Sequence, residues 1–294
     1  MTALDQRQLV PLPSVGSGPL TVRQAPALDL VGLAGLRPTS LAEVDAVAAR
    51  QDRVDRKYLV PARVAAELVD ELAGSHHLLR VKDRLTSYYR SLYFDLVDWS
   101  SIRGQLQGRR RQWKVRSRLY TQDAFCRLEV KAKDGRGRTV KHALSVDPAE
   151  FGTLTPTGAE FVADRLAAAR VEVDVARLFP GVSVEYTRAT LADLITGTRL
   201  TMDSGLLASY CGRSVRLRDD TVLVETKGDL RASGPDRLLL ELGVRPGSVS
   251  KYGVAVSMLA PDLSANKWLR VQRDSFRLDQ HPDRPTPDER PFWL

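Results

Sequence analysis

The feature that most constrains the fold is a set of segments in which charged and apolar residues alternate. Successive side chains of a β-strand point to opposite faces of the sheet. Lys114, Arg116 and Arg118 therefore share one face of a strand whose other face carries Trp113 and Val115. The same alternation recurs at residues 52–60, 86–96, 126–144, 182–191, 198–204 and 221–228. These segments predict a mostly antiparallel sheet with one charged face and one apolar face.

The charged faces also predict how the sheet is arranged. For one strand, exposure to water is the ordinary explanation of a charged face. Several cationic faces turned outward would repel one another, whereas strands that close into a barrel direct them into one lumen. A lumen lined by Lys and Arg is costly to desolvate unless an anion occupies it. We therefore expect an α+β fold in which an antiparallel β-tunnel, a closed barrel with a basic lumen, is flanked by helices and binds a polyanion.

Helical periodicity and capping signals predict the flanking helices. Ser40 and Glu43 have the spacing of a capping box, and Pro61 and Gly74 have the positions of a helix start and a helix end. Helices are predicted at residues 39–50, 61–74, 158–169, 236–242 and 250–259, and a hairpin turn is predicted at 134–137. The domain organisation that follows is a flexible N-terminal tail at 1–38, one folded domain at 39–278 and a flexible C-terminal tail at 279–294.

Composition narrows the possible partners. Lys and Arg number 44 against 36 Asp and Glu, a net charge of +8, which favours an anionic partner such as nucleic acid, a phosphate compound or a lipid surface. The run at 108–114, GRRRQWK, would suit nucleic acid, but aromatic residues that could stack on bases are sparse along the strands, so no nucleic acid is expected.

The sequence also bears on localisation. It has no apolar run of the roughly 18 residues that an integral membrane helix needs and no signal peptide. Its two cysteines, Cys126 and Cys211, support neither a disulfide framework nor a zinc site. We therefore expect a cytoplasmic protein.

Four carboxylates interrupt the cationic rows: Asp55, Glu129, Asp203 and Glu225. One explanation is that they pair with neighbouring Arg and Lys. The other is that one or two of them hold a divalent cation, because Mg²⁺ or Mn²⁺ bound to a polyphosphate takes few protein carboxylates and keeps phosphate oxygens and water as ligands. Glu225 is the best candidate for a metal ligand.

Eight motifs in a fixed order resemble a known family. They are RVDRKYLV at 53–60, SLYFD at 91–95, KVRSRLY at 114–120, LEVKAK at 128–133, EYTRATL at 185–191, TRLTMD at 198–203, VETKG at 224–228 and SKYG at 250–253. The chain is similar over about residues 39–260 to the VTC domain, the catalytic module of eukaryotic vacuolar transporter chaperone polyphosphate polymerases, which has bacterial relatives in the triphosphate tunnel group.

The resemblance implies a role for individual residues of this sequence. It implies that four cations act on the transferred phosphoryl group: Lys57, Arg116, Arg118 and Arg188. It implies that five more bind the nucleotide or the phosphate chain: Lys131, Lys141, Arg199, Lys227 and Lys251. Glu225 would hold Mn²⁺ or Mg²⁺. Two positions depart from the family: Asp55 stands where a glutamate is more common, and Ser248 stands where the eukaryotic polymerases tend to have a lysine.

The function implied by the resemblance is a metal-dependent polyphosphate polymerase that transfers the γ-phosphate of ATP to a growing chain. Its partners would be ATP, inorganic phosphate or polyphosphate, and coupling to transport would need a separate membrane protein. Two alternatives remain open from the residues alone. One is a tunnel-type inorganic triphosphatase, which uses water as the acceptor, and the other is a non-catalytic polyphosphate-binding sensor.

Overall fold

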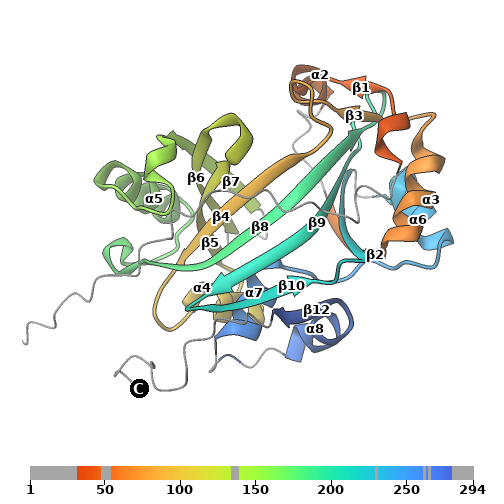
Figure 1. Cartoon of the computed structure of the whole chain (residues 1–294). Helices are drawn as coiled ribbons and strands as arrows, with labels where there is room; N and C mark the ends of the chain where they lie inside the picture. Colours follow the sequence, from red (N-terminus) through yellow and green to blue (C-terminus); the bar gives the residue numbers. More distant parts are fainter. Residues whose placement is uncertain are drawn as a thin grey trace, which may run out of the picture.

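The structure is a computed structural model that describes residues 32–47, 54–133, 139–228, 231–260, 263 and 266–279. Its strands are β1 (Pro38–Thr39), β2 (Val54–Pro61), β3 (His77–Leu79), β4 (Ser87–Asp95), β5 (Gln112–Tyr120), β6 (Phe125–Lys133), β7 (Thr139–Val146), β8 (Phe179–Ala192), β9 (Arg199–Tyr210), β10 (Arg213–Leu217), β11 (Thr221–Gly228) and β12 (Phe276–Asp279). Its α-helices are α2 (Leu41–Val47), α3 (Ala62–Leu72), α4 (Ser100–Leu106), α5 (Pro156–Ala168), α6 (Gly234–Glu241), α7 (Lys251–Leu259) and α8 (Leu269–Ser275) (Figure 1).

The strands form one curved, mostly antiparallel sheet, which confirms the α+β class. Its central order is β7-β6-β5-β4-β8-β9. At β9 the sheet divides, because the first half of this long strand pairs with β11 and the second half pairs with β10. β11 then pairs with β2, and β10 pairs with β12.

The hydrogen bonding does not close the sheet into a barrel. Among the described strands, β7 pairs only with β6 and β2 pairs only with β11, so the predicted closed barrel is not confirmed. Part of the free edge of β2 is occupied instead by the segment that precedes α7. The backbone N–H of Gly247 donates to the carbonyl of Lys57 at 2.7 Å, and Lys57 Nζ donates to the carbonyl of Val249 at 3.2 Å. This segment bridges part of the side that a barrel would close with strand pairing.

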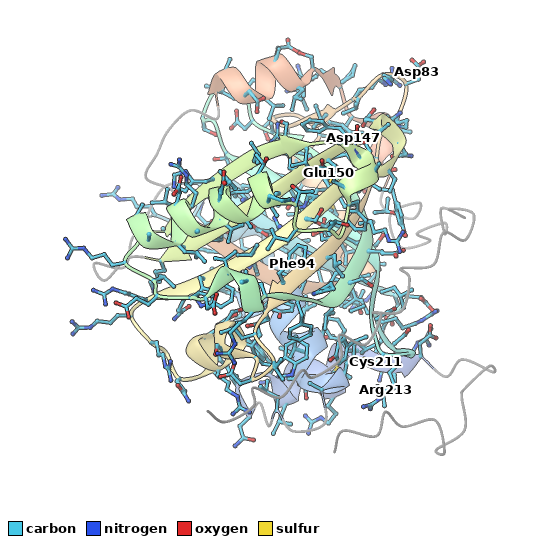
Figure 2. The ribbon with its side chains drawn as sticks, turned by 90° about the vertical axis from the view of Figure 1, so that its left-hand side faces the viewer. Asp83, Phe94, Asp147, Glu150, Cys211 and Arg213 are labelled. Atoms are coloured by element: carbon cyan, nitrogen blue, oxygen red, sulfur yellow. The ribbon has the colours of Figure 1, made fainter. Side chains whose placement is uncertain are left out.

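Helices cover the convex face of the sheet, as the apolar rows predict. α3 packs on outward residues of β2, β8, β9 and β11, including Tyr58, Leu191 and Val224. α5 packs on β5 and β6 through Trp113 and Val130. Figure 2 shows α5 lying across this face, and Phe94 belongs to the same apolar cluster.

The concave face changes character along its strands. On β8, Val182 and Val184 belong to an apolar cluster with α7, whereas Arg188 and Thr190 further along the same face line a cavity. Tyr186 lies at the boundary and belongs to both. β2 and β11 show the same change, from Leu59 and Leu223 to charged residues. The apolar half of the concave face is therefore filled by α7, and the charged half remains as a cavity.

Most predicted elements are present, with shifted ends. The capping box is confirmed, since Ser40 N donates to Glu43 Oε2 at 2.8 Å and Glu43 N donates to Ser40 Oγ at 3.3 Å. α4 and α8 were not predicted because each has only seven residues and no side-chain cap. The predicted turn at 134–137 and most of the two predicted tails lie outside the described residues. Within 32–38, Leu33 and Leu36 are buried in the cluster of α3.

The packing of α7 leads to the first prediction. A Cβ added to Gly253 would lie 2.2 Å from Cη2 of Trp268, whose side chain is fully buried. We expect Gly253→Ala to lower the free energy of unfolding by about 1–3 kcal/mol, because overpacking forces neighbouring groups to move. Urea unfolding measures this loss. Gly74→Ala is the control, since no atom lies within 4 Å of its added Cβ; equal stabilities of the two variants would contradict the packing of α7.

Candidate active site

One cavity of about 610 Å³ lies on the charged half of the concave face. We call it the basic cavity because eleven Lys and Arg residues but only five Asp and Glu residues line it. All ten residues singled out from the sequence lie in its lining: Lys57, Arg116, Arg118, Lys131, Lys141, Arg188, Arg199, Glu225, Lys227 and Lys251. They come from seven strands and from the start of α7. The structure thus brings these residues together, and their individual roles remain predictions.

Glu129 pairs with two of the cations. Its Oε2 lies 2.6 Å from Arg116 Nη2, and its Oε1 lies 2.6 Å from Lys141 Nζ. Burial alone would raise the pKa of Glu129, but the positive charges of Arg116, Arg118 and Lys141 hold it well below its usual value. Pairing, the first explanation for this carboxylate, is confirmed.

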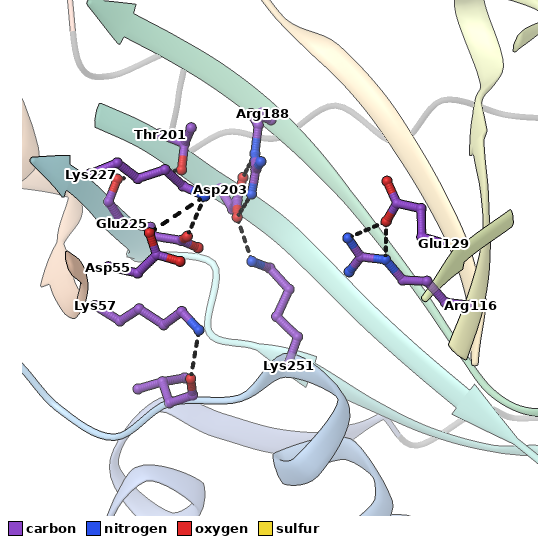
Figure 3. Close-up of polar contacts among 11 residues, drawn as sticks. Asp55, Lys57, Arg116, Glu129, Arg188, Thr201, Asp203, Glu225, Lys227 and Lys251 are labelled. Atoms are coloured by element: carbon purple, nitrogen blue, oxygen red, sulfur yellow. Dashed lines mark hydrogen bonds and ion pairs between the residues drawn. The ribbon is translucent and has the colours of Figure 1, made fainter. Parts of the chain in front are cut away.

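Asp203 is a fully buried carboxylate at the side of the basic cavity (Figure 3). Arg188 donates to it through Nε at 2.6 Å and through Nη2 at 2.8 Å, and Lys251 Nζ lies 2.5 Å from Oδ2. Burial would raise the pKa of Asp203, but the two cations lower it below its usual value. Asp203 therefore stays ionised and holds together a side chain of β8 and one of α7.

Glu225 and Asp55 both approach Lys227. Lys227 Nζ lies 3.1 Å from Glu225 Oε1 and 3.7 Å from Asp55 Oδ1. Burial would raise the pKa of Glu225, but the charges of Lys227 and Lys57 lead a group of cations that lowers it well below its usual value. Two carboxylates on neighbouring strands, β2 and β11, are thus directed at one positive group.

Glu225 and Asp55 are also the candidate ligands of a divalent cation. The described residues contain no cluster of three or more His, Cys, Asp or Glu side chains that could hold a metal ion alone. Glu225 and Asp55 nevertheless supply two oxygen ligands at one place, and Mg²⁺ or Mn²⁺ in phosphate-binding sites often uses only one or two carboxylates beside phosphate and water. The donor set fits such an ion if a phosphate chain completes its coordination.

Tyrosines form one wall of the basic cavity, which the sequence analysis missed. The rings of Tyr93 and Tyr252 stack with centres 4.2 Å apart, and those of Tyr89 and Tyr186 stack with centres 5.3 Å apart. These side chains come from β4, β8 and the first turn of α7. Tyr89 and Tyr93 share one face of β4, which the sequence does show. The pairing of β4 with β8, which brings the rings of Tyr89 and Tyr186 together, is not visible in the sequence.

Three cationic side chains of the basic cavity lie over the faces of these tyrosine rings. The Arg188 guanidinium carbon lies 5.3 Å from the ring centre of Tyr186, and Lys251 Nζ lies 4.7 Å from the same centre. The Arg118 guanidinium lies 5.4 Å from the ring centre of Tyr89. Such contacts are attractive because the face of an aromatic ring is negative. They restrict the guanidinium planes without neutralising their charge.

The remaining positive potential is strong. Burial would raise the pKa of Tyr186, but Arg118, Arg188 and Lys251 together lower it below the usual value of tyrosine. Among the described residues, the one hydrogen-bond partner of Arg118 is Ser91 Oγ, at 3.4 Å. The cavity is therefore suited to bind a ligand with several negative charges.

The buried Asp203 leads to the second prediction. We expect Asp203→Asn to lower the free energy of unfolding by about 3 kcal/mol or more, because Arg188 and Lys251 lose their counter-charge in a buried place. Added tripolyphosphate should recover part of this loss, since an anion replaces the carboxylate. Thermal and urea unfolding measure both effects. Asp274→Asn, which removes an exposed ion pair, is the control and should keep the stability of wild type. An Asp203→Asn protein of wild-type stability would show that the ion pairs of Asp203 do not stabilise the fold.

Solved structures and one family model resemble this chain. No curated protein matches the chain. Among solved structures, the Hippeastrum protein HpAC1, described as a candidate adenylyl cyclase with a dominant triphosphatase activity, has 19% identity and a TM-score of 0.43, with 72% of this chain and 99% of that chain covered. A protein of Bacillus halodurans described as a candidate adenylate cyclase has 15% identity and a TM-score of 0.40, with 66% and 87% covered.

The described helices give no sign of a membrane span, since none combines the necessary length and hydropathy. The family comparison covers most of the curved sheet and most of the residues that line the basic cavity. The family model of the VTC domain matches residues 52–260, from the segment before β2 to the end of α7. The motifs that carried the resemblance all lie within this match. The chain belongs to the VTC domain family.

Proposed function

We propose that this protein is a metal-dependent polyphosphate polymerase that transfers the γ-phosphate of ATP to a growing polyphosphate chain in the basic cavity. The observation that carries the proposal is the convergence of eleven Lys and Arg residues on one cavity whose carboxylates leave it positive. A phosphate chain carries negative charge along its whole length, so it is stabilised by cations spread over several strands. Membership of the VTC domain family supports the same function.

Lys57 and three arginines would act on the phosphoryl group. Arg116, Arg118 and Arg188 present planar guanidinium groups, which suit bidentate contacts with phosphate oxygens. Glu129, Asp203 and the tyrosine rings already hold these groups, so little reorganisation is needed when charge develops in the transition state. Phosphoryl transfer needs in-line positioning and charge stabilisation more than a protein nucleophile.

Glu225 and Asp55 are the residues that would hold the metal ion. A bound Mn²⁺ or Mg²⁺ would neutralise negative charge on the phosphate oxygens. Lys227 lies between the two carboxylates and balances their charge in the protein without ligand. Lys131, Lys141, Arg199, Lys227 and Lys251 would then bind the remaining phosphates of the nucleotide and the chain.

The acceptor decides between the polymerase and its alternatives. A terminal phosphate of the chain, or inorganic phosphate, gives polymer, whereas water gives a triphosphatase. A protein that binds without turnover is a sensor. Because the proposed donor is ATP, we propose that the protein works in the cytoplasm, and export of the product would require a membrane-protein partner.

The products of ATP test the proposed function directly. Purified full-length protein incubated with ATP and Mn²⁺ should form polyphosphate, resolved by gel electrophoresis and destroyed by an exopolyphosphatase. Mg²⁺ and a metal-free sample with chelator are the controls for the ion. Free phosphate as the sole product would establish the triphosphatase instead, and no ATP consumption with either ion would leave a binding protein.

Substitution of Glu225 tests whether catalysis and binding depend on different groups. We expect Glu225→Gln to keep near-native stability and much of the affinity for polyphosphate but to lose metal-dependent turnover on the order of 100-fold, because one electrostatic support of the transition state is removed. Turnover and binding are measured separately over a titration of Mn²⁺.

Glu185→Gln is the matched control. Glu185 is a partly buried carboxylate paired with Arg90 at 3.2 Å, and it does not line the basic cavity. If Glu225 serves only as the partner of Lys227, its substitution will lower stability and change turnover by the same factor at every metal concentration. That result would remove Glu225 from the metal site.

A further inference from the structure

Lys114 lines the basic cavity, but the proposed function gives it no individual role. It precedes Arg116 on the same face of β5, and its Nζ donates to Ser250 Oγ at 3.0 Å. Ser250 is the N-cap of α7, where its Oγ also accepts the backbone N–H of Gly253. Within the part of the chain that the structure describes, no carboxylate lies within 4.0 Å of Lys114 Nζ. Arg116, two residues away, has Glu129 as its counter-ion.

The charged groups that act most strongly on Lys114 are all positive. They are Lys57 from β2, Lys131 from β6, Arg116 from its own strand and Lys267 from the turn Asn266–Trp268. The segment before α7 adds only the neutral hydroxyl of Ser250 and the positive end of a nine-residue helix. Lys114 therefore has cations, and no carboxylate, as its strongest charged neighbours in the described part of the chain.

Burial, and then repulsion from Lys57 and Lys131, lowers the pKa of Lys114 to about 7. The ordinary value for lysine is about 10.4. An arginine in the same place would stay charged, whereas a lysine can lose its proton and so relieve the repulsion in the protein without ligand. A bound anion reverses this balance, because it supplies the missing counter-charge and stabilises the ammonium form.

We propose that Lys114 binds a phosphate group of the polyanion together with Lys57 at the N-terminus of α7, and that it takes up a proton when this phosphate binds. This deepens the proposed function, on which it rests for the identity of the ligand. The phosphate group would take the place of Ser250 Oγ as the acceptor of the Lys114 ammonium. Its proton comes from the solvent and is retained on Nζ while the anion is bound.

The sign of the proton uptake follows from the two states. At pH 8 the unliganded Lys114 is mostly neutral and the liganded one is charged, so binding takes up about one proton. At pH 6 both states are charged, so Lys114 contributes about none. Proton release or uptake by the ligand itself is the same for all variants and cancels in their comparison.

Calorimetric titration of the full-length protein with tripolyphosphate tests the proposal. Buffers with different ionisation enthalpies give the number of protons taken up at pH 6 and at pH 8. Lys114→Arg keeps the charge but cannot titrate, so it should bind within about threefold of wild type and take up about one proton fewer at pH 8. Lys114→Met should bind about tenfold or more weakly at pH 6, the scale of a lost charged hydrogen bond.

Lys133→Met is the control, since Lys133 lies on β6 but does not line the basic cavity. Its affinity and proton uptake should equal those of wild type. Urea unfolding of each variant confirms that it is folded. The proposal is overturned if Lys114→Met binds as tightly as Lys133→Met, or if wild type and Lys114→Arg take up the same number of protons at pH 8.

The outcomes also separate this proposal from the proposed function. Lys114-dependent proton uptake without any polymer from ATP supports the phosphate site and rejects the polymerase. Polymer formation with Lys114→Met unchanged in affinity rejects the phosphate site alone. If tripolyphosphate does not bind wild type at all, both are rejected.

Discussion

Repulsion among the cations of the basic cavity is the constraint on which the rest of the structure depends. A curved sheet brings the charged faces of seven strands together, and the fold tolerates this because four carboxylates are distributed among the cations. Asp203 balances Arg188 and Lys251, Glu129 balances Arg116 and Lys141, and Glu225 and Asp55 both lie beside Lys227. The compensation is incomplete, as the lowered pKa of Tyr186 shows. The cavity is thus stable enough to fold and positive enough to bind a polyanion.

The sequence predicted much of this arrangement because strand alternation is a local property. It placed Lys114, Arg116 and Arg118 on one face without knowledge of any partner strand. It also offered ion pairing as one explanation for Glu129, but it did not identify the partners, Arg116 of β5 and Lys141 of β7. Contacts that depend on strand register were not predictable. The tyrosine wall needs Tyr89 of β4 beside Tyr186 of β8, and neither residue shows this in its own segment. Closure of the sheet was also beyond local patterns, since β2 uses part of its free edge for the segment before α7 rather than for another strand.

The first turn of α7 joins the apolar core to the charged site. Lys251 reaches Asp203, Tyr252 donates to the buried carboxylate of Asp95 at 2.8 Å, and Gly253 allows close contact with Trp268. Burial raises the pKa of Asp95. Three consecutive residues thus attach one helix to β9, β4 and the C-terminal part of the chain. The position of the Lys251 ammonium therefore depends on the packing of the core behind it.

The open sheet has a consequence for the size of the site. In a closed barrel the number of strands and their stagger fix the diameter through a continuous ring of backbone hydrogen bonds. Here no such ring exists among the described strands, and the segment before α7 spans from β2 to β5 through Lys57 and Lys114. Two lysine side chains are consequently part of the closure of the cavity, beside the backbone hydrogen bond from Gly247 to Lys57. These side-chain hydrogen bonds can rearrange while every strand pair stays intact. The cavity can therefore adjust to proposed phosphate chains that differ in bulk and hydration.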